Sequence, residues 1–252
     1  MGEKSKKSRK TDAYLPLSPE KRISMVTDLD SFIEWDADLC EADPLMFHGY
    51  REELEQQREA TGLSDAVITG MARVDGMPVA IAVMSVDFMQ GTMGEIVGER
   101  LTRMIERATE ERLPVVIFCS SRGARVQEGV VALMQMAKAA GALKKHDEAG
   151  LYYLPILTDP TVGGVVASIA MIGDTILAEP GALISFAGTK VLEQTAGQKL
   201  PEGFQRAEFW QEHGFVDKVV KREHLKKTIS FLIAANGGQR GATAEGRMPW
   251  SN

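Results

Sequence analysis

Cysteine is scarce in this sequence, which has only Cys40 and Cys119 among its 252 residues. The two form no CxxC pair, so a zinc ribbon and a disulfide framework are both excluded. Runs of about twenty apolar residues are also lacking, and we expect no transmembrane helix. The net charge is −6, which argues against nucleic-acid binding. We therefore expect a cytoplasmic protein that binds neither a membrane nor nucleic acid.

Several motifs of catalysis are missing as well. No GxxxxGK[ST] phosphate loop, no GxSxG nucleophile motif and no zinc-ligand cluster occurs. The histidines lie far apart in the sequence, and each is interpreted as a surface or helix-end residue rather than a base: His48, His146, His213 and His224. The sequence therefore predicts no metal site and no catalytic serine–histidine–aspartate set.

The composition is that of a globular domain between two tails. Hydrophobic residues make up 44% and charged residues 25%, which allows a sizeable core. Residues 1–14 carry five basic side chains with no apolar segment after them, so they predict a disordered tail rather than a secretory signal. Residues 237–252 predict a flexible tail. The domain is expected at 15–236.

The first half of the domain contains clear local signals. Ser18-Pro19 predicts the start of a short helix, and residues 24–62 are expected to be helical or irregular. Asp75-Gly76 lies between two apolar runs, 68–73 and 78–86, which is a strong hairpin signal. A helix is then predicted where apolar residues repeat on one face: Val97, Leu101, Met104, Ile105 and Ala108.

The second half alternates between buried strands and helices, which favours a layered α/β domain. Two nearly all-apolar runs, 113–119 and 152–158, are typical of strands buried on both faces. The other expected elements are helices at 128–143, from about 163, at 204–213 and at 222–236, and strands at 174–178, 183–186 and 216–220.

Two loops could support chemistry. Residues 120–129 follow one buried strand and residues 159–168 follow the next, and each loop leads through glycine into a helix. Free N–H groups at a helix N-terminus favour negative charge, and glycine lets a ligand approach the backbone closely. Together the loops could direct two N–H donors at one oxyanion, as in enolate stabilisation. For either loop alone, a simple tight turn is the favoured interpretation.

From about residue 17 to about 235 the sequence resembles the β subunit of bacterial acetyl-CoA carboxylase carboxyltransferase. The matching stretches are DPLMFHGY (43–50), TGLSDAV (61–67), FMQGTMG (88–94), GERLTR (98–103), GARVQEG (123–129), LMQMAK (133–138), LTDPT (157–161), FAG (186–188), EQT (193–195) and HGFVD (213–217). The resemblance implies the crotonase-like ββα spiral of the ClpP/crotonase superfamily.

The resemblance also implies the reaction and its partners. A carboxyl group would move from carboxybiotin, carried by a biotin carboxyl carrier protein, to acetyl-CoA, giving malonyl-CoA for fatty-acid or polyketide synthesis. The active site would lie at an interface with an α subunit in an α2β2 assembly. No covalently bound cofactor and no zinc are expected. We assign oxyanion donation to the backbone of Arg122, Gly123, Gly163 and Gly164. The substrate-binding residues are expected to be Gln90, Gly91, Met93, Gly94, Val126, Gly188 and Lys190.

The sequence departs from the family pattern in four respects. It has no N-terminal four-cysteine zinc ribbon, Arg122 and Val126 replace Gly and Met, Gln90 replaces Gly, and Thr189-Lys190 replaces Arg-Arg. Arg122 can keep the oxyanion function only if its backbone φ is negative. Neutral drift is one interpretation of these changes. The alternatives are a specialised paralogue with altered acyl substrate or inhibitor response, a decarboxylase, or a scaffold that only holds an α subunit.

Overall fold

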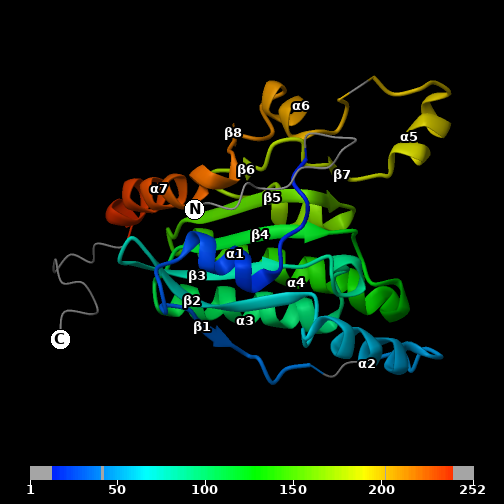
Figure 1. Cartoon of the computed structure of the whole chain (residues 1–252), viewed down its shortest axis with the longest axis horizontal. Coiled ribbons are helices and arrows are strands. Elements are labelled where there is room, and N and C mark those ends of the chain that lie inside the picture. Colours follow the sequence, from blue (N-terminus) through cyan, green and yellow to red (C-terminus); the bar gives the residue numbers. More distant parts are fainter. Residues whose placement is uncertain (1–12, 41–42, 202, 241–252) are drawn as a thin grey trace.

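The computed structural model describes residues 13–40, 43–201 and 203–240. Within them the chain forms an eight-stranded sheet in the order β1-β2-β3-β4-β5-β6-β8, with β7 paired to β5 (Figure 1). The strands are β1 Ile33–Trp35, β2 Val67–Val74, β3 Met77–Met84, β4 Val115–Ser121, β5 Tyr153–Val162, β6 Leu177–Ala178, β7 Ile184–Ser185 and β8 Lys218–Val219. The strands from β3 to β8 along this order are parallel, which confirms the predicted α/β class.

Helices cover both faces of the sheet. In Figure 1, α1 and α7 lie on one face, and α3 and α4 lie on the other. The helices are α1 Pro19–Val26, α2 Tyr50–Thr61, α3 Glu95–Glu110, α4 Gly129–Glu148, α5 Thr189–Ala196, α6 Ala207–Glu212 and α7 Leu225–Arg240. Each face has its own apolar cluster. In β3, for instance, Ala82 belongs to one cluster and Val83 to the other, which explains the unbroken apolar run in the sequence.

Local signals in the sequence predicted several elements well. The Ser18 hydroxyl accepts a hydrogen bond from Lys21 N at 3.4 Å and caps α1, as expected. Asp75 and Gly76 both have positive φ, 47° and 79°, and join β2 to β3 in the predicted antiparallel hairpin. All five apolar positions predicted on one face of α3 are buried.

Other predictions need correction. Strand β1 was missed in a region expected to be helical or irregular, because it is only three residues long and two of them are exposed. Strand β5 continues to Val162, into the predicted loop, because β7 supplies backbone partners for Thr161 and Val162. Helix α4 extends to Glu148 and α7 to Arg240, both beyond the predicted ends.

The expected tails are only partly within the described residues. Ala13 and Tyr14, assigned to the N-terminal tail, are buried, and the ring of Tyr14 lies 4.5 Å from the guanidinium carbon of Arg222. Residues 1–12 and 241–252 lie outside the described part of the chain. Among the described residues, no helix is both long and apolar enough to span a membrane.

Candidate active site

The two glycine-bearing loops meet at the carboxyl ends of β4 and β5. A Cβ atom added to Gly163 would lie 2.9 Å from the Cα of Gly123, and one added to Gly123 would lie 3.6 Å from the Cα of Gly163. Both residues have positive φ, 76° and 106°, a conformation that suits glycine. The loops therefore touch through backbone, and a side chain at Gly163 would push them apart, whereas one at Gly123 would make only an ordinary contact.

The backbone amides of these loops are less available than we predicted. Arg122 N donates to Gln90 O at 3.2 Å, Gly123 N to the Ser121 hydroxyl at 3.1 Å, and Gly163 N to Ser185 O at 2.8 Å. Gly164 N makes no hydrogen bond to another described residue. Three of the four predicted donors thus have internal acceptors, because each turn folds back against a neighbouring strand or loop. Only the acceptor of Gly123 is a side chain that a rotamer change could remove.

The loop after β3 packs directly against this contact. Gln90 has a φ of 57° and an exposed side chain, so it adopts a conformation typical of glycine. Gly91 has a φ of 70°, and a Cβ there would lie 2.4 Å from Ser120 O. The backbone at Arg122 is not in the positive-φ region. The condition for retaining the N–H function after replacement of glycine is therefore met.

Two of the predicted substrate-binding residues lie elsewhere than expected. The Met93 side chain is fully buried in the core, so only its backbone could face a ligand. A Cβ on Gly94 would lie 2.4 Å from Glu128 Oε1, which places Gly94 against a carboxylate of the protein. The sequence around Met93 and Gly94 suggested that they line a cleft, but in the structure both residues are closely packed inside the protein. Their roles as substrate contacts are not supported.

Two of the remaining predicted binding residues, Val126 and Gly188, lie at the surface. Val126 is 81% exposed, three residues after Gly123. Gly188 is exposed at the N-cap of α5, and the strand that leads to it starts beside the second loop, since Ser185 O accepts from Gly163 N. Helix α5 then projects from the body of the molecule (Figure 1). The side chain of Lys190 lies outside the described part of the structure.

Sequence reasoning missed a buried polar network beside the first loop. Arg125 forms a bidentate ion pair with Asp65, with distances of 2.6 and 2.9 Å, and both side chains are almost completely buried. Tyr50 donates to Glu128 Oε1 at 2.6 Å. These residues all occur in the stretches that match the family. Sequence reasoning nevertheless places charged side chains at the surface when the residues that pair with them are unknown. The network is the main feature of the site that the sequence did not reveal.

The pKa values of Arg125 and Glu128 in this network are both raised, but for different reasons. Burial alone would lower the pKa of Arg125, but the Asp65 carboxylate outweighs it and raises that pKa, so the guanidinium stays charged. Burial raises the pKa of Glu128, although the Tyr50 hydroxyl, Glu95 N–H and Arg125 all favour its charged form. Because two donors point at its two oxygens, we treat Glu128 as a carboxylate.

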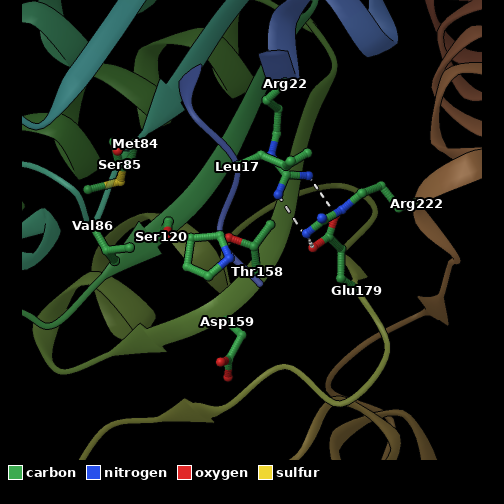
Figure 2. A pocket seen from close by; sticks show the side chains of 11 residues that line it. Leu17, Arg22, Met84, Ser85, Val86, Ser120, Thr158, Asp159, Glu179 and Arg222 are labelled. Carbon is green, nitrogen blue, oxygen red and sulfur yellow. Dashed lines mark hydrogen bonds and ion pairs between the residues drawn. The ribbon is translucent and has the colours of Figure 1, made fainter. Parts of the chain in front are cut away.

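A second buried ion cluster (Figure 2) lies on the face that α1 and α7 cover, where the Arg22 guanidinium lies over the Phe118 ring. Glu179 accepts from Arg22 Nη1 at 2.5 Å and from Arg222 Nη2 at 2.7 Å. The adjoining cavity measures about 10 Å³, room for about one water molecule. Burial would raise the pKa of Glu179, but the two arginines lower it. The cavity is too small for an acyl-CoA group, so this cluster is a structural clasp rather than the active site.

Other reactive side chains are buried. Burial raises the pKa of the Cys119 thiol to about 12, which makes it a poor nucleophile. His146 lies in the last turn of α4, at a helix end as predicted, but it is fully buried between Thr109 and Tyr152 O, and burial lowers its pKa. Among the described residues, no group of three or more histidine, cysteine or acidic side chains could hold a metal ion.

Solved structures share this fold. The crystal structure of transcarboxylase 12S superimposes with a TM-score of 0.75 at 24% identity, covering 85% of this chain and 40% of that one. A Pseudomonas malonate decarboxylase hetero-dimer gives a TM-score of 0.69 at 18% identity, covering 92% and 90% of the two chains. At such identities the likeness shows the fold alone. It defines the class by fold: a crotonase-like α/β domain, the fold shared with these two proteins.

Closer relatives identify the family within that class. The carboxyl transferase domain family matches residues 19–230. An acetyl-coenzyme A carboxylase carboxyl transferase subunit beta from Clostridium botulinum (strain Kyoto / Type A2) is 55% identical over 87% of this chain and 76% of its own length. One from Synechococcus sp. (strain WH7803) is 52% identical over 90% and 79%. The chain belongs to this family of carboxyl transferase β subunits and is a transferase.

Proposed function

We propose that this chain, together with an α-type subunit, transfers a carboxyl group from carboxybiotin on a carrier protein to acetyl-CoA, forming malonyl-CoA. The observation that carries the proposal is the backbone contact between Gly123 and Gly163, in the loops that lead to α4 and to the short π-helix Val166–Ala170. The names of the relatives supply the substrate. Carboxyl transfer from carboxybiotin depends on placement and oxyanion support more than on acid or base side chains, which suits a site built from backbone.

The proposed work of the protein is to hold the thioester enolate. Gly164 N–H makes no hydrogen bond to another described residue, and it lies just before the short π-helix Val166–Ala170. Gly123 N–H becomes a second donor when the Ser121 hydroxyl rotates away. When bound, carboxybiotin would supply the carboxyl group and, through its ureido nitrogen, the acceptor for the acetyl proton. Loss of one oxyanion donor typically costs a factor of about 10²–10³ in rate.

An exposed apolar stripe next to the site supports a partner chain. Val126 is followed on α4 by residues that share one helical face, and the stripe consists of Val126 (81% exposed), Val130 (64%), Leu133 (57%) and Met134 (59%). Contiguous apolar surface of this kind is typical of an interaction site. We propose that it packs against the α subunit in an α2β2 assembly, with the carrier protein delivering carboxybiotin to the shared site.

A label-transfer assay tests this function. The chain and its cognate α subunit would be mixed with carrier protein bearing ¹⁴C-carboxybiotin and with acetyl-CoA. We expect labelled malonyl-CoA only when every component is present, and none when the biotin on the carrier protein is not carboxylated. Release of CO2 from malonyl-CoA without any carrier would instead show the decarboxylase. Binding of the α subunit without any turnover would show the scaffold.

The substitutions at Arg122 and Val126 support a narrower proposal of altered substrate or inhibitor response. Both side chains are exposed at the first loop, where they can contact a ligand or partner rather than the core. We expect Arg122→Gly and Val126→Met to change the ratio of kcat/KM for propionyl-CoA and acetyl-CoA, or the response to inhibitors. Unchanged ratios and responses in both variants would leave neutral drift as the explanation.

A further inference from the structure

We propose that Arg125 is a positioning residue for carboxyl transfer, because it fixes the loop that presents Gly123 to Gly163. This inference rests on the proposed function of the two loops. It concerns a side chain that cannot touch substrate, since the Arg125 side chain has no exposed surface. Its influence must therefore pass through the groups that it binds.

All five N–H groups of Arg125 have acceptors. Both terminal nitrogens bind the Asp65 carboxylate, and each of them also makes one further bond: Nη1 to the Tyr50 hydroxyl at 3.3 Å and Nη2 to Thr92 O at 2.8 Å. Nε donates to Thr92 Oγ1 at 3.2 Å. A fully satisfied guanidinium has one geometry, whereas lysine offers three donors from a single point. The network therefore specifies arginine.

Glu128 extends the network to the N-terminus of α3. Its Oε2 accepts from Glu95 N at 2.5 Å, while its Oε1 accepts from the Tyr50 hydroxyl. Asp65 and Glu128 carry two negative charges. Arg125 pairs with both, buried Arg100 attracts Asp65, and the positive end of the α3 dipole favours Glu128. The absence of a side chain at Gly94 gives the carboxylate room to reach this position. One network of charged side chains therefore holds both the first loop and the N-terminus of α3.

The backbone carries this constraint to the site. Met93 N donates to Gly123 O at 2.8 Å, and Arg125 N donates to Met93 O at 3.0 Å. Thr92, the residue before Met93, accepts two hydrogen bonds from the Arg125 guanidinium. A shift of Arg125 therefore moves Thr92 and Met93, and with them the peptide that includes Gly123. Misplacement by about 1 Å can cost a factor of about 10² in rate.

Arg125→Lys and Tyr50→Phe test the inference in the complex with the α subunit. We expect Arg125→Lys to lower kcat by about 100-fold with little change in KM for acetyl-CoA. Tyr50→Phe keeps the ring and removes only the hydroxyl that bridges Arg125 and Glu128, leaving their direct ion pair at 3.7 Å, so we expect a smaller loss, about tenfold, in a fully folded protein. Tyr50→Phe carries the test alone if Arg125→Lys does not fold.

Arg222→Lys is the matched control, because Arg222 is equally buried in the clasp on the opposite face (Figure 2). We expect it to lower Tm as much as Arg125→Lys while kcat per folded complex stays that of the unsubstituted protein. Wild-type kcat in Tyr50→Phe and Arg125→Lys, or an equal loss in Arg222→Lys, would overturn the positioning role. An unsubstituted complex without carboxyl transfer would instead refute the proposed function itself.

Discussion

At the scale of single residues, two substitutions in the site have opposite backbone consequences. Arg122 replaces a glycine that the family usually has, yet its φ is not positive, so the larger residue is accommodated without backbone strain. Gln90 also stands where glycine is usual, and its φ of 57° lies in the left-handed region. A non-glycine residue there costs on the order of 1 kcal/mol. The need for glycine therefore persists at position 90 and not at 122.

We therefore expect Gln90→Gly to stabilise the protein. Relief of the left-handed strain outweighs the greater chain entropy of glycine, for a net gain of up to about 1 kcal/mol in the free energy of unfolding. Denaturation in guanidinium chloride measures it. Gln205→Gly is the control: its φ is also positive, 65°, but its buried amide donates to Ala187 O, so that variant should lose stability. A destabilised Gln90→Gly would contradict the strain argument.

At the scale of elements, the clasp of Figure 2 ties together parts of the chain that are far apart in sequence. Arg22 lies in α1, Glu179 follows β6, and Arg222 precedes α7. Arg222 also donates to Leu15 O at 3.2 Å, which holds the segment before α1. The clasp therefore links both helices of one face to the edge of the sheet. Breaking a buried ion cluster of this kind typically costs about 3–5 kcal/mol.

The pKa of Glu179 gives this clasp a pH dependence. Its folded pKa is lowered by the arginines despite burial, so its contribution is present above the ordinary glutamate pKa and is lost as pH falls through the folded value. We expect Glu179→Gln to be less stable than the unsubstituted protein at neutral pH. The gap in unfolding free energy should narrow below a pH of about 4. Thermal unfolding from pH 7 to pH 3 measures it, and a gap that does not narrow would contradict the charge-based role.

At the scale of the whole molecule, the sequence predicted the layers of the fold better than the chemistry of the site. Apolar runs and turn residues revealed the parallel sheet and the hairpin at Asp75-Gly76, because these signals are local. The contact between Gly123 and Gly163 also followed from two similar loops on neighbouring strands. The partners of their amides did not, because Ser185 approaches only through the pairing of β7 with β5.

The partners of Arg125 were equally hidden from sequence reasoning. Asp65 precedes it by 60 positions and Tyr50 by 75, so no spacing rule connects them. Short edge strands such as β1 escaped for a related reason: three residues show no clear alternation of apolar and polar positions. Both features depend on contacts between residues that are far apart in the sequence, so only the folded structure reveals them.

The most direct test of the central claim is kcat of Gly163→Ala compared with Gly150→Ala, each in complex with the α subunit. Both glycines have positive φ, 76° and 71°, so both variants bear similar backbone strain, but a Cβ at position 150 meets nothing within 4 Å. A Cβ at position 163 lies 2.9 Å from the Cα of Gly123 and forces the loops apart. We predict a loss of at least about 100-fold in kcat for Gly163→Ala and wild-type kcat for Gly150→Ala. Equal kcat in the two folded variants would contradict the claim that backbone contact between the loops builds the site.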